Sequence, residues 1–246
     1  MFLNTNMKPF FSIHNCFSSE QLAYLESLEQ NFQADYHTGN YTDRGQVLGL
    51  STEKDMTDDI LNEIYDMIKD KVEENIGTLY PTYGVFSKGI MPMTEHIDVD
   101  PTHIDYNKSP AYTIVIPLKS NYTESTIVWN AVKKDMRKPI GPRNIIMLED
   151  SDYTYTEAEK KITSHCEQKN LKHLGKPYMF KHNRGDIIFW KREHIHASST
   201  SSNYNYVLDT KSMKPELNEL DVNTGSFKTL DKVVKRFLLL LTRWDR

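Results

Sequence analysis

The sequence lacks the features that define several classes of protein. It has two cysteines, Cys16 and Cys166, which provide neither a disulfide framework nor a cysteine metal site of familiar spacing. Its longest apolar runs, such as Phe237 to Leu241, are far shorter than the roughly twenty residues of a membrane-spanning helix. The segment from Met1 to Phe11 has no basic stretch followed by a sustained apolar one, so we expect no secretion signal. These absences predict a cytoplasmic protein without a membrane span.

The charge balance argues against a general affinity for polyanions. Thirty Lys and Arg residues against 34 Asp and Glu residues give a formal net charge of −4, so no overall positive field attracts nucleic acid or an anionic membrane. The small basic cluster of Lys133–Lys134, Arg137–Lys138 and Arg143 keeps a nucleic-acid substrate open as an alternative. With 38% hydrophobic residues the chain can form a full core, and we expect one domain over residues 1–246.

Residues 1–79 have the periodicity of helices that support a sheet. Apolar residues in Phe10–Phe17 indicate an entering strand, and a Ser-x-x-Gln capping signal opens an amphipathic helix over Ser18–Phe32. Apolar residues spaced by four predict a second helix over Ile60–Ile76, which ends at a glycine. The segment between the helices, Asp35–Lys54, has the composition of a loop.

The pattern changes to short β-rich runs over residues 80–246, which predicts a β-sandwich core flanked by the helices. The predicted strands are Tyr83–Phe86, Ile90–Ile97, Tyr112–Leu118, Ser125–Trp129, Ile145–Leu148, Tyr178–Lys181, Asp186–Trp190 and Phe237–Leu241. Two polar inserts interrupt this series, at 150–176 and 198–234. The first contains a weakly helical stretch, Thr156–Ile162, and the second is our candidate for a lid.

Three residues could bind one metal ion. His96 and Asp98 lie two positions apart in an extended run, so their side chains point to the same face. His196 follows the strand Asp186–Trp190 and would arrive from elsewhere in the sheet. Two imidazole nitrogens and one carboxylate on one face of a metal leave three coordination positions open, an arrangement suited to non-haem Fe(II).

Residues that precede the proposed ligands extend this pattern. Phe86 and Gly89 precede the His-x-Asp pair, and Gly185–Asp186 opens the apolar strand before His196. In these features the chain resembles the Fe(II)- and 2-oxoglutarate-dependent dioxygenases, most of all their prolyl-hydroxylase-type branch. The resemblance covers about Tyr80–Trp190 and the C-terminal strand. It implies a double-stranded β-helix of the jelly-roll or cupin type, the two histidines and the aspartate as Fe(II) ligands, and 2-oxoglutarate and O2 as cosubstrates.

The resemblance also implies that Arg236 binds the distal carboxylate of 2-oxoglutarate. A planar guanidinium can hold a carboxylate with two charge-assisted hydrogen bonds. In the family this base follows soon after the distal histidine, whereas here 40 positions separate it from His196. We interpret 198–234 as an insertion before the last strand. If it is not an insertion, Lys119 or Arg243 is an alternative anchor.

Two alternatives for the metal ligands stay open. His103 and Asp105 repeat the His-x-Asp pattern seven residues after the first pair. A shift by seven reverses strand parity, so both pairs cannot share one face of an unbroken strand. His194 could likewise replace His196, although the spacing from Gly185 favours His196.

The resemblance implies hydroxylation of a substrate, with oxidative decarboxylation of 2-oxoglutarate to succinate and CO2. We expect the substrate to be a small molecule, an amino acid or a peptide. Two other functions use the same residues differently. One is a divalent-metal cupin that acts as a hydrolase or isomerase, and the other is a jelly-roll binding module without catalysis.

Overall fold

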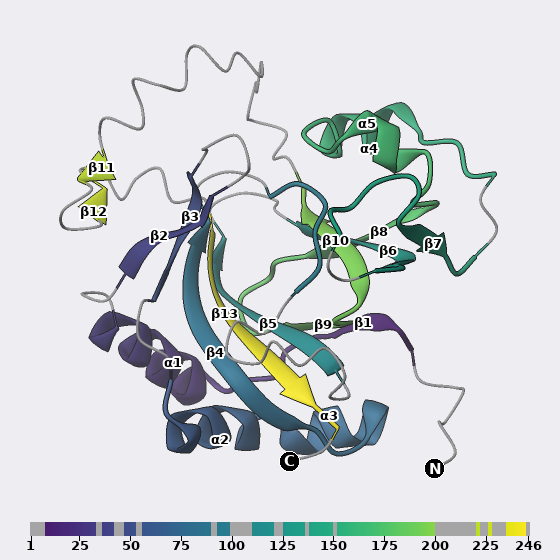
Figure 1. Ribbon diagram of the computed structural model, residues 1–246. Helices are drawn as coiled ribbons and strands as arrows, with labels where there is room; N and C mark the ends of the chain where they lie inside the picture. The colour runs from purple at the N-terminus through teal and green to yellow at the C-terminus, as the bar shows by residue number, and fades with distance from the viewer. Residues whose placement is uncertain are drawn as a thin grey trace.

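The computed structural model describes most of the chain and places it in two facing antiparallel sheets with helices outside them (Figure 1). The described residues are 8–32, 36–41, 47–52, 56–89, 93–98, 110–120, 125–135, 138–149, 152–199, 220–221, 226–227 and 235–244. The predicted lid segment therefore lies largely outside the described residues, as do His103 and Asp105. No helix in the described part of the chain is long and apolar enough to cross a membrane.

The larger sheet has seven strands in the order β1-β9-β5-β13-β4-β3-β2. Their bounds are β1 Phe10–Ile13, β9 Ile187–Lys191, β5 Pro110–Ser120, β13 Lys235–Arg243, β4 Tyr80–Gly89, β3 Val47–Thr52 and β2 Tyr36–Tyr41. Side chains alternate across this sheet, as β5 shows. Tyr112, Ile114 and Ile116 belong to the core beneath the helices, whereas Val115 belongs to the core between the sheets.

The smaller sheet is built around β6 (Ser125–Lys133), which pairs with β10 (His194–Ser198) on one side. On its other side β6 pairs with β7 (Ile145–Met147) and β8 (Pro177–Lys181). A short hairpin of β11 (Leu220–Asp221) and β12 (Ser226–Phe227) stands apart from both sheets. The two main sheets form the double-stranded β-helix that the resemblance implies.

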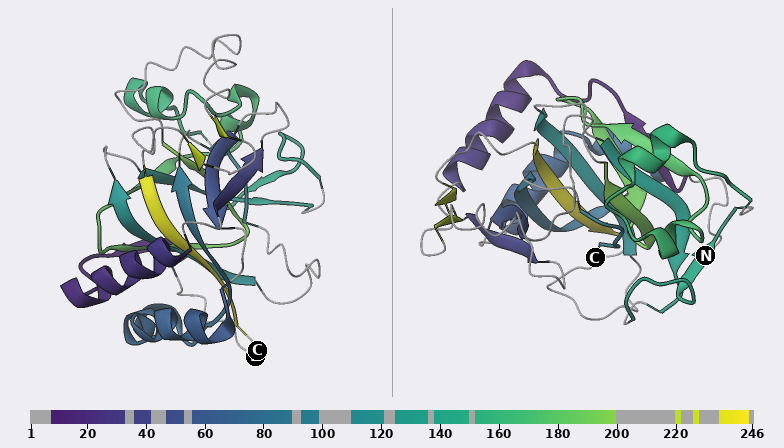
Figure 2. Two further views of the ribbon diagram at one scale, coloured as in Figure 1. Left: turned by 90° about the vertical axis from the view of Figure 1, so that its left-hand side faces the viewer. Right: turned by 90° about the horizontal axis from the view of Figure 1, so that it is seen from above.

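Helices α1 (Ser19–Asn31), α2 (Asp58–Asp66) and α3 (Lys69–Ile76) cover the outer face of the larger sheet. Figure 2 shows α1 and α2 on the opposite side of the molecule from α4 (Glu157–Ile162) and α5 (Gln168–Leu171). The capping box that opens α1 is confirmed, because Ser18 and Gln21 bond each other's backbone N–H groups.

One predicted helix is in fact two. The four-residue spacing predicts a continuous helix over Ile60–Ile76, but α2 ends at Asp66 and α3 begins at Lys69. On a straight helix with 3.6 residues per turn, each step of four rotates a side chain by about 40°. The break keeps Ile64, Ile68 and Ile76 buried against one surface, with exposures of 0%, 1% and 3%.

Two other predictions are wrong. The predicted loop Asp35–Lys54 contains the hairpin β2–β3, which extends the edge of β4. The N-terminal segment therefore supplies strands as well as supporting helices. The predicted strand Ile90–Ile97 is not a strand in its described part, where His96 makes an isolated bridge to His196. Both differences depend on which segments pair with each other, which local periodicity does not reveal.

The described part of the insert, residues 152–176, forms a layer on the outer face of the smaller sheet. It supplies Cys166, Leu171 and Leu174 to a core with residues of β6 and β10. The capping box at the start of α4 confirms the helix predicted over Thr156–Ile162. The inserted residues thus back the sheet that carries His196.

Candidate metal centre

The structure brings the three predicted ligands together. His196 lies on β10, and the segment 93–98 runs along the free edge of that strand. The His96 and His196 backbones exchange two N–H···O bonds of 2.9 Å. One ligand atom from each of His96, Asp98 and His196 lies within 4.8 Å of the other two.

Backbone carbonyls fix the orientation of both imidazoles. Nδ1 of His96 lies 2.7 Å from the carbonyl oxygen of Thr94, and Nδ1 of His196 lies 3.1 Å from that of His194. A carbonyl oxygen only accepts hydrogen bonds, so each Nδ1 carries the proton and donates it. Nε2 of each ring is therefore the nitrogen left to bind a metal.

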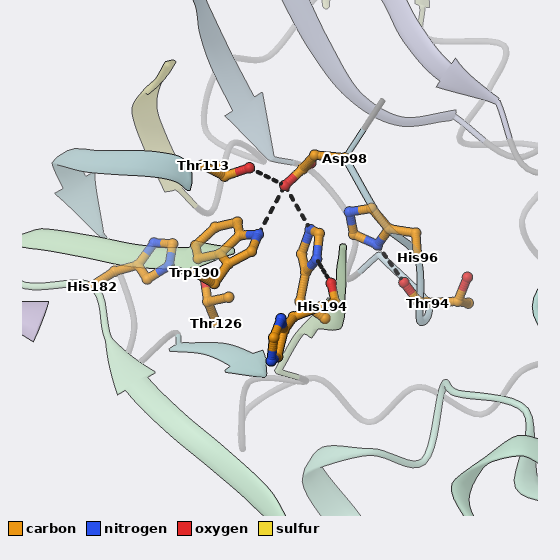
Figure 3. Close-up of polar contacts among 9 residues, drawn as sticks. Thr94, His96, Asp98, Thr113, Thr126, His182, Trp190 and His194 are labelled. Carbon is orange, nitrogen blue, oxygen red and sulfur yellow. Dashed lines mark hydrogen bonds and ion pairs between the residues drawn. The ribbon is translucent and has the colours of Figure 1, made fainter. Parts of the chain in front are cut away.

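Asp98 is oriented by two donors from the larger sheet (Figure 3). The Thr113 hydroxyl donates to Oδ2 over 2.6 Å, and the indole N–H of Trp190 donates to the same oxygen over 2.9 Å. Thr113 on β5 and Trp190 on β9 are direct cross-strand partners, so the sheet register sets both donors side by side. Nε2 of His196 lies 3.3 Å from the same oxygen.

The surroundings keep Asp98 ionised. Burial works to raise the pKa of this carboxyl, but the His196 and His96 imidazoles and the Thr113 hydroxyl together hold the pKa well below its usual range. An anionic carboxylate beside two imidazoles is a donor set that suits a divalent transition-metal cation.

Aromatic rings exclude water from one side of the centre. The centroid of the Trp190 ring lies 4.7 Å from that of His196, and the His96 centroid lies 4.1 Å from it. Trp190 and His196 are 2% and 3% exposed, so the distal histidine is buried away from solvent.

The rival histidine, His194, lies outside the group of three. Its ring is 2% exposed, and neither nitrogen has a hydrogen-bond partner among the described residues. Burial, aided by the charges of Lys191 and His196, lowers the pKa of His194 to about 4. The ring is therefore neutral at physiological pH. His194 contributes to the centre through its backbone carbonyl, which bonds the His196 ring, and not through its side chain.

Arg236 lies near the start of β13, and its side chain is outside the described residues. Its backbone is in register with Lys88 on β4 and with Lys119 on β5. Its role as a cosubstrate anchor stays a prediction. Arg243 lies at the opposite end of β13 and is 8% exposed.

The residues that sequence reasoning missed are the donors to Asp98. Thr113 is the one Ser or Thr residue within the apolar run Tyr112–Leu118, and that interruption was the available signal. Trp190 closes the apolar run Asp186–Trp190, where nothing in the sequence distinguishes it from a core residue. It is buried, yet its indole N–H points to the aspartate.

A second polar pair lies between the sheets, away from the three ligands. The Thr126 hydroxyl and Nε2 of His182 are 2.8 Å apart and buried. The ring of His182 contacts Phe237, the residue after Arg236, at a centroid distance of 6.3 Å. Figure 3 shows this pair separated from Asp98 by the Trp190 ring.

The fold and these three side chains define a double-stranded β-helix protein with a two-histidine, one-carboxylate group. No protein-family model matches the sequence, and no curated protein sequence matches it either. Solved structures do match, and they place the fold among those of the 2-oxoglutarate–Fe(II) oxygenases.

One match is an oxidoreductase of the 2OG-Fe(II) oxygenase family from Burkholderia pseudomallei. It has 10% identity and a TM-score of 0.51, and the match covers 96% of this chain and 84% of that one. EctD from S. alaskensis, solved with 2-oxoglutarate and 5-hydroxyectoine, has 11% identity and a TM-score of 0.51 over 97% and 73%. A prolyl-4-hydroxylase from Pseudomonas putida has 6% identity and a TM-score of 0.48 over 97% and 94%. The two matches with TM-scores of 0.51 establish the fold alone.

Proposed function

We propose that the protein is an Fe(II)- and 2-oxoglutarate-dependent oxygenase that hydroxylates a substrate and releases succinate and CO2. In this proposal His96, Asp98 and His196 hold Fe(II). The observation that carries it is the convergence of their three ligand atoms within 4.8 Å on this fold. The orientation of each ligand by a second group supports a built metal site rather than a chance cluster.

The residues around the site have separate tasks. Bound Fe(II) would supply the redox chemistry that couples decarboxylation of 2-oxoglutarate to oxidation of the substrate. The two imidazoles would bind the metal through Nε2, and Asp98 supplies the negative charge that favours a divalent cation. Trp190 keeps solvent from the His196 side, which protects a reactive centre from side reactions.

Arg236 is the proposed partner of the distal carboxylate of 2-oxoglutarate. Its backbone lies between Lys88 and Lys119 in the sheet, so this end of β13 is rich in basic residues. Such a concentration suits a dianionic cosubstrate in a chain whose net charge of −4 gives no general attraction for it. The substrate proposed is a small molecule, an amino acid or a peptide.

The proposal is tested by anaerobic titration of metal-free protein with Fe(II) or Mn(II), followed by 2-oxoglutarate. The wild type should bind one metal ion and then 2-oxoglutarate, while H96A and H196A should lose metal binding. H173A serves as a control, because His173 lies outside the group of three. R236A should keep metal binding and weaken 2-oxoglutarate binding. Metal binding without any 2-oxoglutarate binding would refute the proposal and favour a cupin-type hydrolase or isomerase.

A second comparison decides between the two His-x-Asp pairs. D98A should abolish metal binding in the same titration, and D105A should leave it intact. The reverse result would transfer the ligand role to His103 and Asp105. Absence of metal binding in the wild type would leave a binding module without catalysis.

A further inference from the structure

The metal-ligand segment has two faces, and the second face is bonded to the insert. His96 and Asp98 point into the space between the sheets, toward His196 and Trp190. Ile97, between them, packs instead into the outer core formed by β6, β10 and the insert. Glu95 lies on that same outer face, where it contacts Asn170 of α5.

Glu95 is a buried carboxylate with partners supplied by the insert. It is 7% exposed, and its Oε1 accepts a hydrogen bond of 2.7 Å from the side-chain amide of Asn170, which is 1% exposed. Both carboxylate oxygens also lie within reach of the Glu167 backbone N–H, at 3.2 and 3.1 Å. Burying a carboxylate carries a large desolvation cost unless such donors offset it.

Neighbouring contacts join the same two segments. Nε2 of His165 lies 3.0 Å from the carbonyl oxygen of Met93, so the ring donates to the start of the ligand segment. The thiol of Cys166 also faces Glu95. Burial raises the pKa of this thiol well above its usual range. The charge and side-chain hydrogen bond of Glu95 raise it further, and a hydrogen bond with the Glu95 backbone opposes them. The insert thus contacts the segment through three consecutive residues, 165–167, and through Asn170.

Among the described residues, few backbone hydrogen bonds hold the ligand segment. Its backbone meets β10 at one bridge, His96 to His196, and at one further bond from Ser198 N–H to the Met93 carbonyl, 3.2 Å long. A regular strand would have a continuous ladder along the whole segment. Metal ligands must be held to within about 0.5 Å of their working geometry. Side-chain hydrogen bonds on the outer face can therefore help to position the two ligands.

We propose that Glu95, bonded to Asn170 and to the Glu167 backbone, is a positioning residue that holds His96 and Asp98 in place for metal binding. The inference rests on the proposed function, because it takes these residues as metal ligands. It assigns the insert at 150–176 the role of a rigid support for the centre. Glu95 itself does not face the metal position and touches no reacting atom.

The test compares Mn(II) affinity and thermal unfolding in wild type, E95A, E95Q and N170A. E95A should weaken Mn(II) binding by about 10- to 100-fold, the range typical of lost outer-shell partners. N170A should weaken it less, since the Glu167 N–H still bonds Glu95. E95Q keeps one acceptor oxygen for Asn170 and should recover part of the affinity. The matched control is E157A, because Glu157 is an exposed residue of the same insert that pairs with Lys160.

A spectroscopic measurement separates positioning from general loss of stability. The Mn(II) electron paramagnetic resonance spectrum of E95A, taken at saturating metal and below its unfolding transition, should differ from that of wild type, while E157A should match wild type. If wild type binds Mn(II) and the E95A and N170A variants bind it equally tightly, the inference is wrong and the proposed function stands. If wild type binds no metal, both fail. If E95A and N170A both fail to fold, Glu95 is a folding determinant and the positioning role is refuted.

Discussion

Replacing Trp190 by phenylalanine removes one donor from Asp98 and leaves an aromatic ring in the core. The lost bond is the 2.9 Å contact from the indole N–H to Oδ2. A hydrogen bond to a charged group contributes about 1.5 to 3 kcal/mol. Since about 1.4 kcal/mol corresponds to a tenfold change in a dissociation constant, W190F should weaken Mn(II) binding by about 10- to 100-fold. The Thr113 hydroxyl still bonds the carboxylate, so binding should not be abolished.

The assay is titration of metal-free protein with Mn(II), with W129F as the matched control. Trp129 is also fully buried, and its indole N–H donates over 2.8 Å to the Tyr155 hydroxyl, in the outer core of the smaller sheet. Both substitutions remove the same atoms from a core and should lower stability to a similar extent. Only W190F should change the Mn(II) dissociation constant. Equal affinities in W190F and wild type, or equal losses in W190F and W129F, would refute the reasoning.

Four further substitutions test the ligand assignment and the fold. H196A should abolish Mn(II) binding and H194A should preserve it to within a few fold, because only the first ring belongs to the group of three; loss of binding in both by titration would reopen the assignment. Asp186 accepts three hydrogen bonds, and although burial opposes them, its neighbours lower its pKa. A lowered folded-state pKa means that this stabilisation is present above the unfolded-state value, near 4, and is lost as the pH falls through the folded-state value. D186N should therefore lower the free energy of unfolding in urea at pH 7 by about 2 kcal/mol. The difference from wild type should shrink as the pH falls below 4, and a pH-independent difference would contradict this. G84A should lower the free energy of unfolding by about 1 to 3 kcal/mol, because the added methyl carbon would lie 2.6 Å from Leu61 Cδ2. An unchanged denaturation midpoint would contradict this and show that the helix layer can shift to make room.

Local patterns predicted much of the fold because they determine local structure. The capping residues of α1 and α4 lie within four positions of the groups they bond. Strands β4, β5, β6, β8, β9 and β13 are apolar enough to be visible as short runs. The hairpin β2–β3 had no such signal, since its strands are defined by pairing with each other and with the edge of β4.

The candidate site likewise contains residues that the sequence reveals and residues that only the structure reveals. His96, Asp98 and His196 could be named because the order of residue types carries the pattern of the ligands. Their partners could not, since Thr113 and Trp190 meet Asp98 only through the register of β5 and β9. Glu95 was invisible for a related reason. Its donors lie more than 70 positions away, in an insert whose packing no periodicity predicts.

The central claim is that this site couples consumption of 2-oxoglutarate to an oxidation. The most direct measurement is release of labelled CO2 from 2-oxoglutarate that carries its label in the carboxyl group next to the ketone. Fe(II)-loaded protein is assayed in air, and succinate is measured in parallel. The account predicts release that requires Fe(II) and O2, gives equal amounts of CO2 and succinate, and falls to background in H196A. An iron-loaded wild type that releases no more CO2 than H196A would contradict it.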